Sequence, residues 1–139
     1  MTGVQTCALP ISLKSIASSG EISRVMLAVK SSLATQDTIS LLVFDEIDAN
    51  VGGEIAHAVG AKMRALAKDH QALCITHLPQ VAAVADAQFV VTKEYAKDRT
   101  TSRLREVEGK ARVEEIARML GGKGDSALAH ARTLLGACK

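Results

Sequence analysis

The sequence contains few aromatic residues. They make up 2% of its 139 residues, and tryptophan is absent. Proteins that bind single-stranded nucleic acid usually stack the bases on aromatic side chains, so this composition does not favour that class. The formal net charge is only +2, and a charge this small indicates neither a nucleic-acid surface nor an acidic partner. Acidic and basic residues are interspersed between residues 93 and 118, which is typical of a solvated surface.

The sequence also lacks cysteine pairs and long apolar runs. Cys7, Cys74 and Cys138 are odd in number and scattered, and none has the CxxC or metal-ligand spacing. This pattern favours reduced thiols in a cytoplasmic setting. No apolar run approaches the roughly 20 residues that a membrane-spanning helix needs. The length of the chain suits one hydrophobic core, so we expect one domain at most.

The first eleven residues, MTGVQTCALPI, differ in character from the remainder. They do not form a targeting signal, because no basic segment precedes them and their apolar stretch is short. They resemble the translation of a common sequencing-library adapter. We therefore expect residues 1–11 to be a non-native tail, residues 12–139 to carry the native sequence, and the native protein to begin upstream.

Hydrophobic periodicity predicts alternating helices and strands. The predicted elements are a helix at 21–34, a strand at 39–44, a helix at 55–68, a strand at 71–76, a short helix at 79–85, strands at 88–93 and 102–107, and helices at 112–120 and 126–135. The first two strands are continuous apolar runs separated by a helix, which favours parallel neighbours in a sheet covered on both faces. The two later strands predict an antiparallel hairpin at one end of this sheet. The fold class is therefore α/β.

Polar residues follow each of the two predicted parallel strands. LLVFDEIDANVGG places Asp45 and Glu46 after the first strand, and Thr76 and His77 follow the second. Ligands of open α/β sheets bind beyond the carboxyl ends of parallel strands, so we expect these residues to share one edge. Successive strand residues point in opposite directions, so one carboxylate can hold a metal ion while the other orients a water molecule. The same residues could instead be loop or helix-capping acids and a hydrogen-bonded structural histidine.

Three segments together resemble the motifs of ATP-binding-cassette (ABC) ATPase heads, and within them the SMC-like heads of bacterial DNA repair proteins. SSGEISRVMLAVKS resembles the signature motif, LLVFDEIDANVGG the Walker B strand with its D-loop, and CITHLPQVAAVAD the switch-histidine loop. The resemblance continues through VEEIARMLGG and ALAHARTLL and covers residues 12–139. It implies the C-terminal lobe of a P-loop ATPase head, with a mainly parallel sheet flanked by helices, then a hairpin and two helices.

The resemblance also implies ATP and Mg2+ as cofactors and a role for each motif residue. Asp45 would hold Mg2+ through water, Glu46 would act as general base, and His77 would contact the γ-phosphate. Asp48 in the D-loop would contact a partner subunit. The signature loop that caps ATP on the opposite head would consist of Ser18, Ser19, Gly20 and Glu21.

The partners implied by the resemblance are a second head in a homodimer, a missing N-terminal lobe and DNA. No membrane is implied. The function implied is DNA double-strand-break repair and recombination, in the cytoplasm of a bacterium and associated with the nucleoid.

Two departures from the family pattern are visible. Ser19 stands where the signature usually has glycine, and a Cβ there narrows the allowed backbone conformations. The chain also has no GxxxxGK[ST] sequence, which phosphoryl-transfer heads need, and GGKGDS at 121–126 lies between two predicted helices. We therefore expect the chain alone to hydrolyse almost no ATP.

Three alternatives stay open on sequence grounds. The first is the nucleotide-binding domain of a transporter, although such domains usually follow Asp-Glu with proline. The second is a binding module without catalytic activity, although such a module would not need the acids or His77. The third is a metal-dependent hydrolase that uses Asp45, Glu46 and His77 as ligands.

Overall fold

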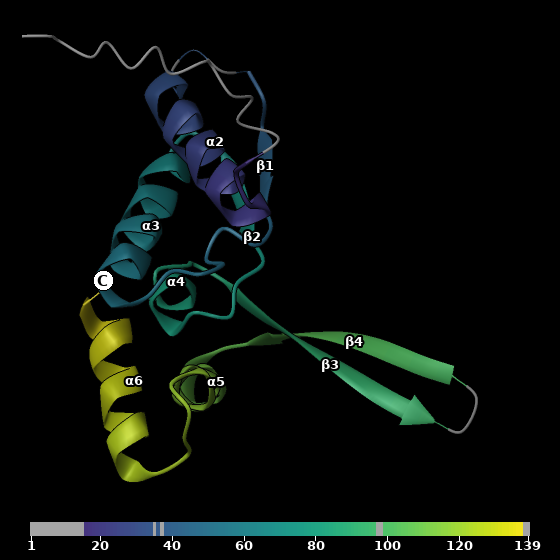
Figure 1. The fold of residues 1–139 in the computed structure, drawn as a ribbon. Coiled ribbons are helices and arrows are strands. Elements are labelled where there is room, and N and C mark those ends of the chain that lie inside the picture. Colours follow the sequence, from purple (N-terminus) through teal and green to yellow (C-terminus); the bar gives the residue numbers. More distant parts are fainter. Residues whose placement is uncertain (1–15, 35, 37, 97–98, 138–139) are drawn as a thin grey trace, which may run out of the picture.

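The computed structural model describes residues 16–34, 36, 38–96 and 99–137, so the predicted non-native tail, Cys7 and Cys138 lie outside the described residues. Each predicted helix and strand is confirmed, with ends that differ by a few residues. In chain order the elements are α2 (Ser19–Leu33), β1 (Leu41–Phe44), α3 (Gly53–Leu66), β2 (Gln71–Cys74), α4 (Pro79–Ala83), β3 (Gln88–Ala96), β4 (Arg99–Val107), α5 (Gly109–Met119) and α6 (Asp125–Ala137) (Figure 1).

The first half of the fold is a parallel strand pair packed on two helices. β1 and β2 run parallel, with Leu41 opposite Gln71 and Phe44 opposite Cys74, and α3 connects them. The predicted parallel pairing is therefore confirmed. One face of the pair packs against α2 and α3 in a core formed by Leu27, Leu42, Phe44, Ile47, Val59, Met63, Leu66 and Val81.

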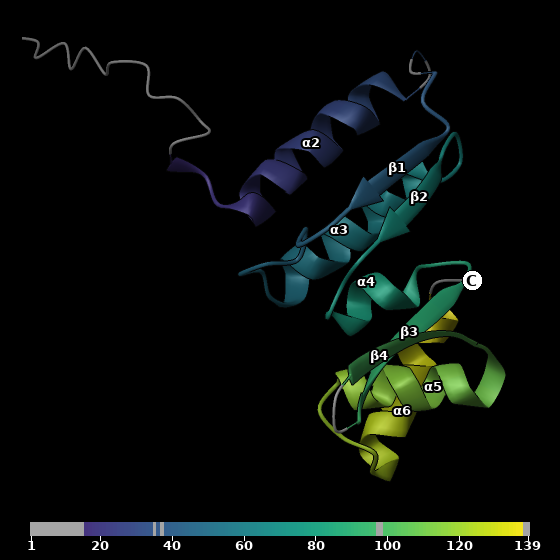
Figure 2. The same ribbon diagram turned by 90° about the vertical axis from the view of Figure 1, so that its right-hand side faces the viewer.

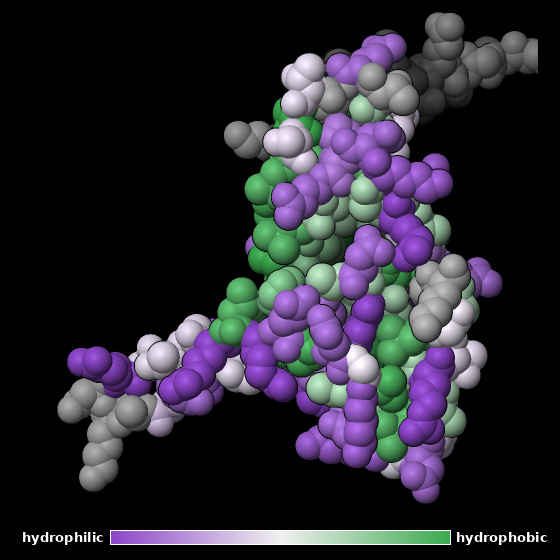
Figure 3. All heavy atoms as spheres, turned by 180° about the vertical axis from the view of Figure 1, so that it is seen from behind, coloured by the Kyte–Doolittle hydropathy of each residue, from purple (hydrophilic) through white to green (hydrophobic). Residues whose placement is uncertain are grey.

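The other face of this strand pair is open, so the prediction that both faces are covered is wrong for the described chain. Leu41, Val43, Leu73 and Ile75 lie about half exposed or more. Figure 3 shows hydrophobic atoms gathered along this side of the molecule. Both faces are apolar because the strands are continuous apolar runs, but the described helices cover only the face that bears Leu42 and Phe44.

The hairpin forms a sheet of its own. β3 and β4 pair in antiparallel register from Gln88 opposite Val107 to Ala96 opposite Arg99, and neither strand pairs with β1 or β2. The predictions of a mainly parallel sheet and of a hairpin at its end are therefore wrong for the described residues. The fold is mixed α/β, with one parallel and one antiparallel pair. Figure 1 shows the hairpin extending away from the helices.

The short helix α4 links two small hydrophobic cores. Its Val81 belongs to the core of the first half. Its next two residues belong to a second core, which consists of Ala82, Ala83, Ile116, Ala117, Ala131 and Leu134 from α4, α5 and α6. Figure 2 shows α4 between the two halves. Within the described part of the chain, no helix combines the length and the apolar character needed to cross a bilayer.

Candidate functional site

The carboxyl ends of β1 and β2 bring the predicted polar residues to one edge. The last residues of the two strands are paired, and the N–H of Ile75 donates to the carbonyl of Phe44 at 2.9 Å. The loop after β1 therefore begins beside the loop after β2, which carries Thr76 and His77. This confirms the predicted common edge. It follows from parallel pairing alone, because strands that run the same way end on the same side.

Asp48 connects these two loops. Its side chain is only 2% exposed. Its Oδ2 accepts hydrogen bonds from the backbone N–H of His77 at 2.8 Å and of Leu78 at 3.2 Å, and also from the hydroxyl of Thr76. The imidazole Nδ1 of His77 lies 3.1 Å from the same oxygen. The third acid of the segment is therefore the one that contacts the histidine.

The hydrogen bonds of Asp48 explain how its charge is tolerated in a buried place. Burial raises the pKa of its carboxyl, but the bonds from the Thr76 hydroxyl and the His77 N–H outweigh burial and hold the pKa below its usual value. Asp48 therefore stays ionised at neutral pH. All the printed contacts of this carboxylate are within the chain, and the expected contact of Asp48 with a partner subunit stays a prediction.

Asp45 and Glu46 are both exposed at the end of β1. The hydroxyl of Ser19 at the start of α2 donates to Oε2 of Glu46, and the hydroxyl of Ser23 donates to the carbonyl of Asp45 at 3.0 Å. Glu46 has a φ of 55°, in the left-handed region that costs a residue with a Cβ about 1 kcal/mol or more. Strain of this kind is common at functional sites, where the surrounding structure maintains it.

Gly20 allows the start of α2 to approach this acidic loop. A Cβ at Gly20 would lie 2.8 Å from the Cβ of Ala49 and 2.8 Å from the carbonyl oxygen of Glu46. Arg24, one helical turn later, donates from Nη1 to the carbonyls of Ile47 and Ala49 at 3.1 and 3.0 Å. Contact with the chain's own loop therefore accounts for the missing side chain at position 20.

Ser18 and Glu21 form the N-terminal cap of α2. The backbone N–H of Ser18 donates to Oε2 of Glu21 at 2.9 Å, and the N–H of Glu21 donates to the Ser18 hydroxyl at 3.4 Å. The backbone and hydroxyl bonds from Ser18 lower the pKa of Glu21. The four residues of the predicted signature loop therefore all make contacts within this chain. The cap itself could be predicted from the S-x-x-E spacing.

Ser23 and Arg24 were not predicted as site residues. Both lie within about one turn of Gly20 on the same helix, and that spacing was the only available signal for them. Their acceptors are carbonyl groups more than 20 residues away, and a single sequence does not indicate such distant partners.

The exposed carboxylates would suit a Mg2+ ion that is also bound by the phosphates of a nucleotide. Magnesium ions in nucleotide sites are commonly held by one or two carboxylates, waters and the phosphates of the substrate. Asp45, an exposed carboxylate at the strand end, fits that role. Among the described residues, no group of three or more His, Cys, Asp or Glu side chains could hold a metal ion by itself.

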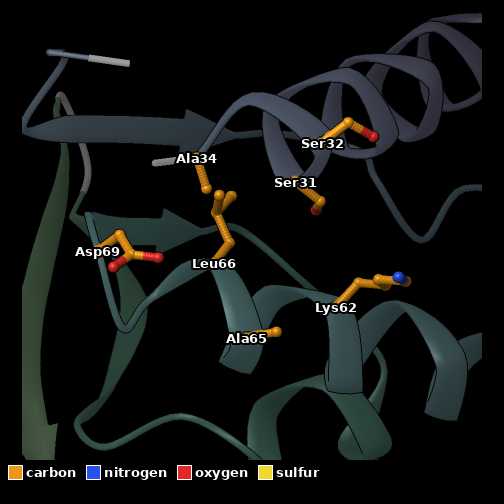
Figure 4. A pocket seen from close by; sticks show the side chains of 7 residues that line it. All are labelled: Ser31, Ser32, Ala34, Lys62, Ala65, Leu66 and Asp69. Atoms are coloured by element: carbon orange, nitrogen blue, oxygen red, sulfur yellow. The ribbon is translucent and has the colours of Figure 1, made fainter. Parts of the chain in front are cut away.

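A pocket of about 240 Å³ lies at the opposite end of the parallel strands. Its walls come from the ends of α2 and α3 and the turn that follows α3 (Figure 4). The lining residues are Ser31, Ser32, Ala34, Lys62, Ala65, Leu66 and Asp69. None of them is a predicted site residue, so the pocket is separate from the acidic loop and His77.

The chain is similar to bacterial proteins named DNA repair protein RecN. The protein from Treponema pallidum is 50% identical over 125 residues, which cover 88% of this chain and 22% of the relative. Identity is 44% over 126 residues with the Bacillus subtilis protein and 49% over 124 residues with the Deinococcus radiodurans protein. The chain thus spans about a fifth of the length of these relatives. No family model matches the chain.

These similarities confirm the resemblance to bacterial DNA repair proteins that the motifs predicted. They favour this resemblance over the transporter alternative, because these relatives are named as DNA repair proteins and their alignments cover most of this chain.

Proposed function

We propose that this RecN-like chain is the C-terminal part of an ATPase head that acts in DNA double-strand-break repair and recombination. The observation that carries the proposal is the meeting of three segments at the ends of β1 and β2: Ser19 contacts Glu46, and Asp48 contacts His77. A hydrolytic site for a nucleotide needs a base, a phosphate contact and a metal-binding carboxylate close together. Glu46, His77 and Asp45 offer these groups.

Each residue would then have a distinct task. Glu46 would orient the attacking water and accept its proton. His77 would contact the γ-phosphate, and Asp45 would hold Mg2+. The ion, when bound, would neutralise charge on the phosphates. The signature-loop residues 18–21 would contact ATP bound to a second head, since the N-terminus of a helix attracts anions.

The proposed partners follow from what the chain lacks. It has no GxxxxGK[ST] sequence, and it covers about a fifth of its relatives' length. We propose that the missing lobe supplies the phosphate-binding loop and covers the open face of β1 and β2. The other partners are a second head, which would complete the site, and DNA, which is suggested by the name of the relatives.

A chimera tests this proposal. In it, residues 16–137 of this chain replace the matching segment of the Treponema pallidum relative. We expect the chimera to hydrolyse ATP in the presence of Mg2+, and Glu46→Gln to reduce turnover at least about 100-fold, because the water would lose its base. The Glu46→Gln variant should also accumulate as a nucleotide-bound dimer in size-exclusion chromatography.

The matched control is Glu54→Gln, because Glu54 is an exposed acid in the first turn of α3. We expect this control to retain full activity. Unchanged hydrolysis in the Glu46→Gln chimera would remove Glu46 from its assigned role. A folded chimera that binds no ATP would contradict the proposed function itself.

A further inference from the structure

We propose that Asp48 is a positioning residue for His77, whose imidazole it holds in one orientation and one tautomer. The catalytic consequence rests on the function proposed above. The contact itself does not, because it is a property of the fold. The inference starts from the contrast between the two side chains: His77 is 71% exposed, while Asp48 is 2% exposed.

The geometry restrains His77 at two points. Oδ2 of Asp48 accepts the backbone N–H of His77 at 2.8 Å and lies 3.1 Å from its ring Nδ1. Fixing an exposed side chain in one rotamer costs conformational entropy. The buried carboxylate offsets this cost, because it is already fixed by Thr76 and by the backbone N–H of Leu78. The imidazole is therefore held by an anchor that cannot easily move.

The same contact selects the tautomer. An ionised carboxylate can only accept hydrogen bonds, so Nδ1 of His77 must carry a proton to bind Asp48. The neutral ring then has a free lone pair at Nε2. In the doubly protonated ring both nitrogens are donors, and Nε2 is then the one that can donate to a phosphate oxygen. Nε2 is therefore the atom left for a ligand.

The contact also joins His77 to the loop that carries the acids. Asp48 lies three residues after Asp45 and two after Glu46. Thr76 contributes from the other strand, since its hydroxyl donates to Asp48 and accepts the N–H of Leu78 at 3.0 Å. A change in the position of one loop is thereby passed to the other.

A double-mutant cycle in the chimera tests whether Asp48 acts through His77. We expect His77→Ala and Asp48→Asn each to lower kcat about 10- to 100-fold, because a displaced catalytic group loses much of its effect. The double variant should lie within about twofold of His77→Ala, since the two residues act as one unit. Asp69→Asn, a change to an exposed acid distant from the strand ends, should leave kcat unchanged.

If the loss of kcat in the double variant equals the product of the two single losses, Asp48 does not act through His77, and the inference is overturned. An unaltered kcat in a folded Asp48→Asn chimera would overturn it as well.

The ring of His77 gives a readout that is independent of ATP hydrolysis. In the chimera with 15N-labelled histidine, we expect the His77 signal, assigned by its loss in His77→Ala, to report a proton on Nδ1. Asp48→Asn should remove that preference. A wild-type ring that carries its proton on Nε2 overturns the inference even if hydrolysis is normal. If the chimera hydrolyses no ATP but the ring carries its proton on Nδ1, the proposed function fails and the contact stands.

Discussion

Asp48 shows how a single buried charge can connect two loops. Its carboxylate accepts hydrogen bonds from one hydroxyl and two backbone N–H groups, and it lies beside an imidazole. Those bonds replace the water that burial removes. Because they favour the ionised form, the protonation of Asp48 is tied to the folding of the chain.

We predict that Asp48 makes the chain sensitive to acid. Its pKa is lower in the folded chain than the usual value near 4, so its contribution to stability is fully present above about pH 4. The contribution is lost as the pH falls through the lowered pKa. Urea unfolding from pH 7 to pH 3 should therefore show a steeper acid decline in the wild-type chain than in Asp48→Asn. Parallel declines would contradict this, and Asp69→Asn should follow the wild type.

Cys74 is expected to be chemically quiet in the folded chain. Burial, followed by the negative charges of Asp48 and Asp45, raises the pKa of its thiol to about 12. At pH 8 iodoacetamide should alkylate Cys74 at least about 100-fold more slowly in the folded chain than in urea, because the thiolate is the nucleophile. Peptide mass spectrometry separates Cys74 from Cys7 and Cys138. Equal rates in both conditions would contradict the burial of this thiol at the end of β2.

At the residue scale, the sequence predicted which residue types meet but not how they pair. The ends of two apolar strands indicated where Asp45, Glu46 and His77 would lie. The acid that contacts His77 is Asp48, and its partners lie 28 to 30 residues away. Such long-range pairing depends on the path of the loop, where Glu46 takes an unusual φ. No periodicity encodes that path.

At the scale of elements, α2 can lie close to the acidic loop after β1 because Gly20 has no side chain. We predict that Gly20→Ala lowers the free energy of unfolding by about 1–3 kcal/mol, because the new methyl group would meet a backbone carbonyl and Ala49 at 2.8 Å. Gly136→Ala is the matched control. It lies in α6 with nothing within 4 Å, and alanine there should stabilise the helix by up to about 1 kcal/mol. Urea unfolding measures both, and equal effects would contradict the close approach.

The contact between α4 and α5 depends on Arg112. Its Nη2 donates to the carbonyls of Ala82, Ala83 and Ala85 at 3.3, 3.3 and 2.6 Å. We predict that Arg112→Ala costs about 1–3 kcal/mol, because it leaves carbonyl groups at the end of α4 without a charged donor. Arg103→Ala on the exposed hairpin should cost less than about 1 kcal/mol. Thermal unfolding measures the loss of stability in each variant. A smaller loss in Arg112→Ala than in Arg103→Ala would contradict the prediction.

The types of the elements could be read from periodicity, but their assembly into sheets could not. Gln88 and Val107 begin a hairpin that was correctly predicted as antiparallel, yet it forms a sheet by itself. Alternating and apolar patterns state which face of a strand prefers burial. They do not indicate which neighbour covers that face, and the described residues leave one face of β1 and β2 uncovered.

At the scale of the whole molecule, the parallel strand pair has an apolar face that none of the described helices covers. Val43 and Ile75 on the open sheet face are each 58% exposed, and contiguous apolar surface of this kind marks a place where other protein packs. We predict that the chain alone associates or binds a hydrophobic dye, and that Val43→Thr with Ile75→Thr reduces this. The chimera should bind little dye, because the added lobe would cover the face. A monomeric chain that binds no dye would contradict the prediction.

The place of α4 in the chain has a mechanical consequence. The helix begins two residues after His77, and it contributes side chains to both cores. A ligand that displaces the imidazole of His77 would therefore also displace α4, which packs in both cores. A shift of the loop that carries His77 is therefore expected to move α5 and α6 as well, because both helices pack against α4 in the second core.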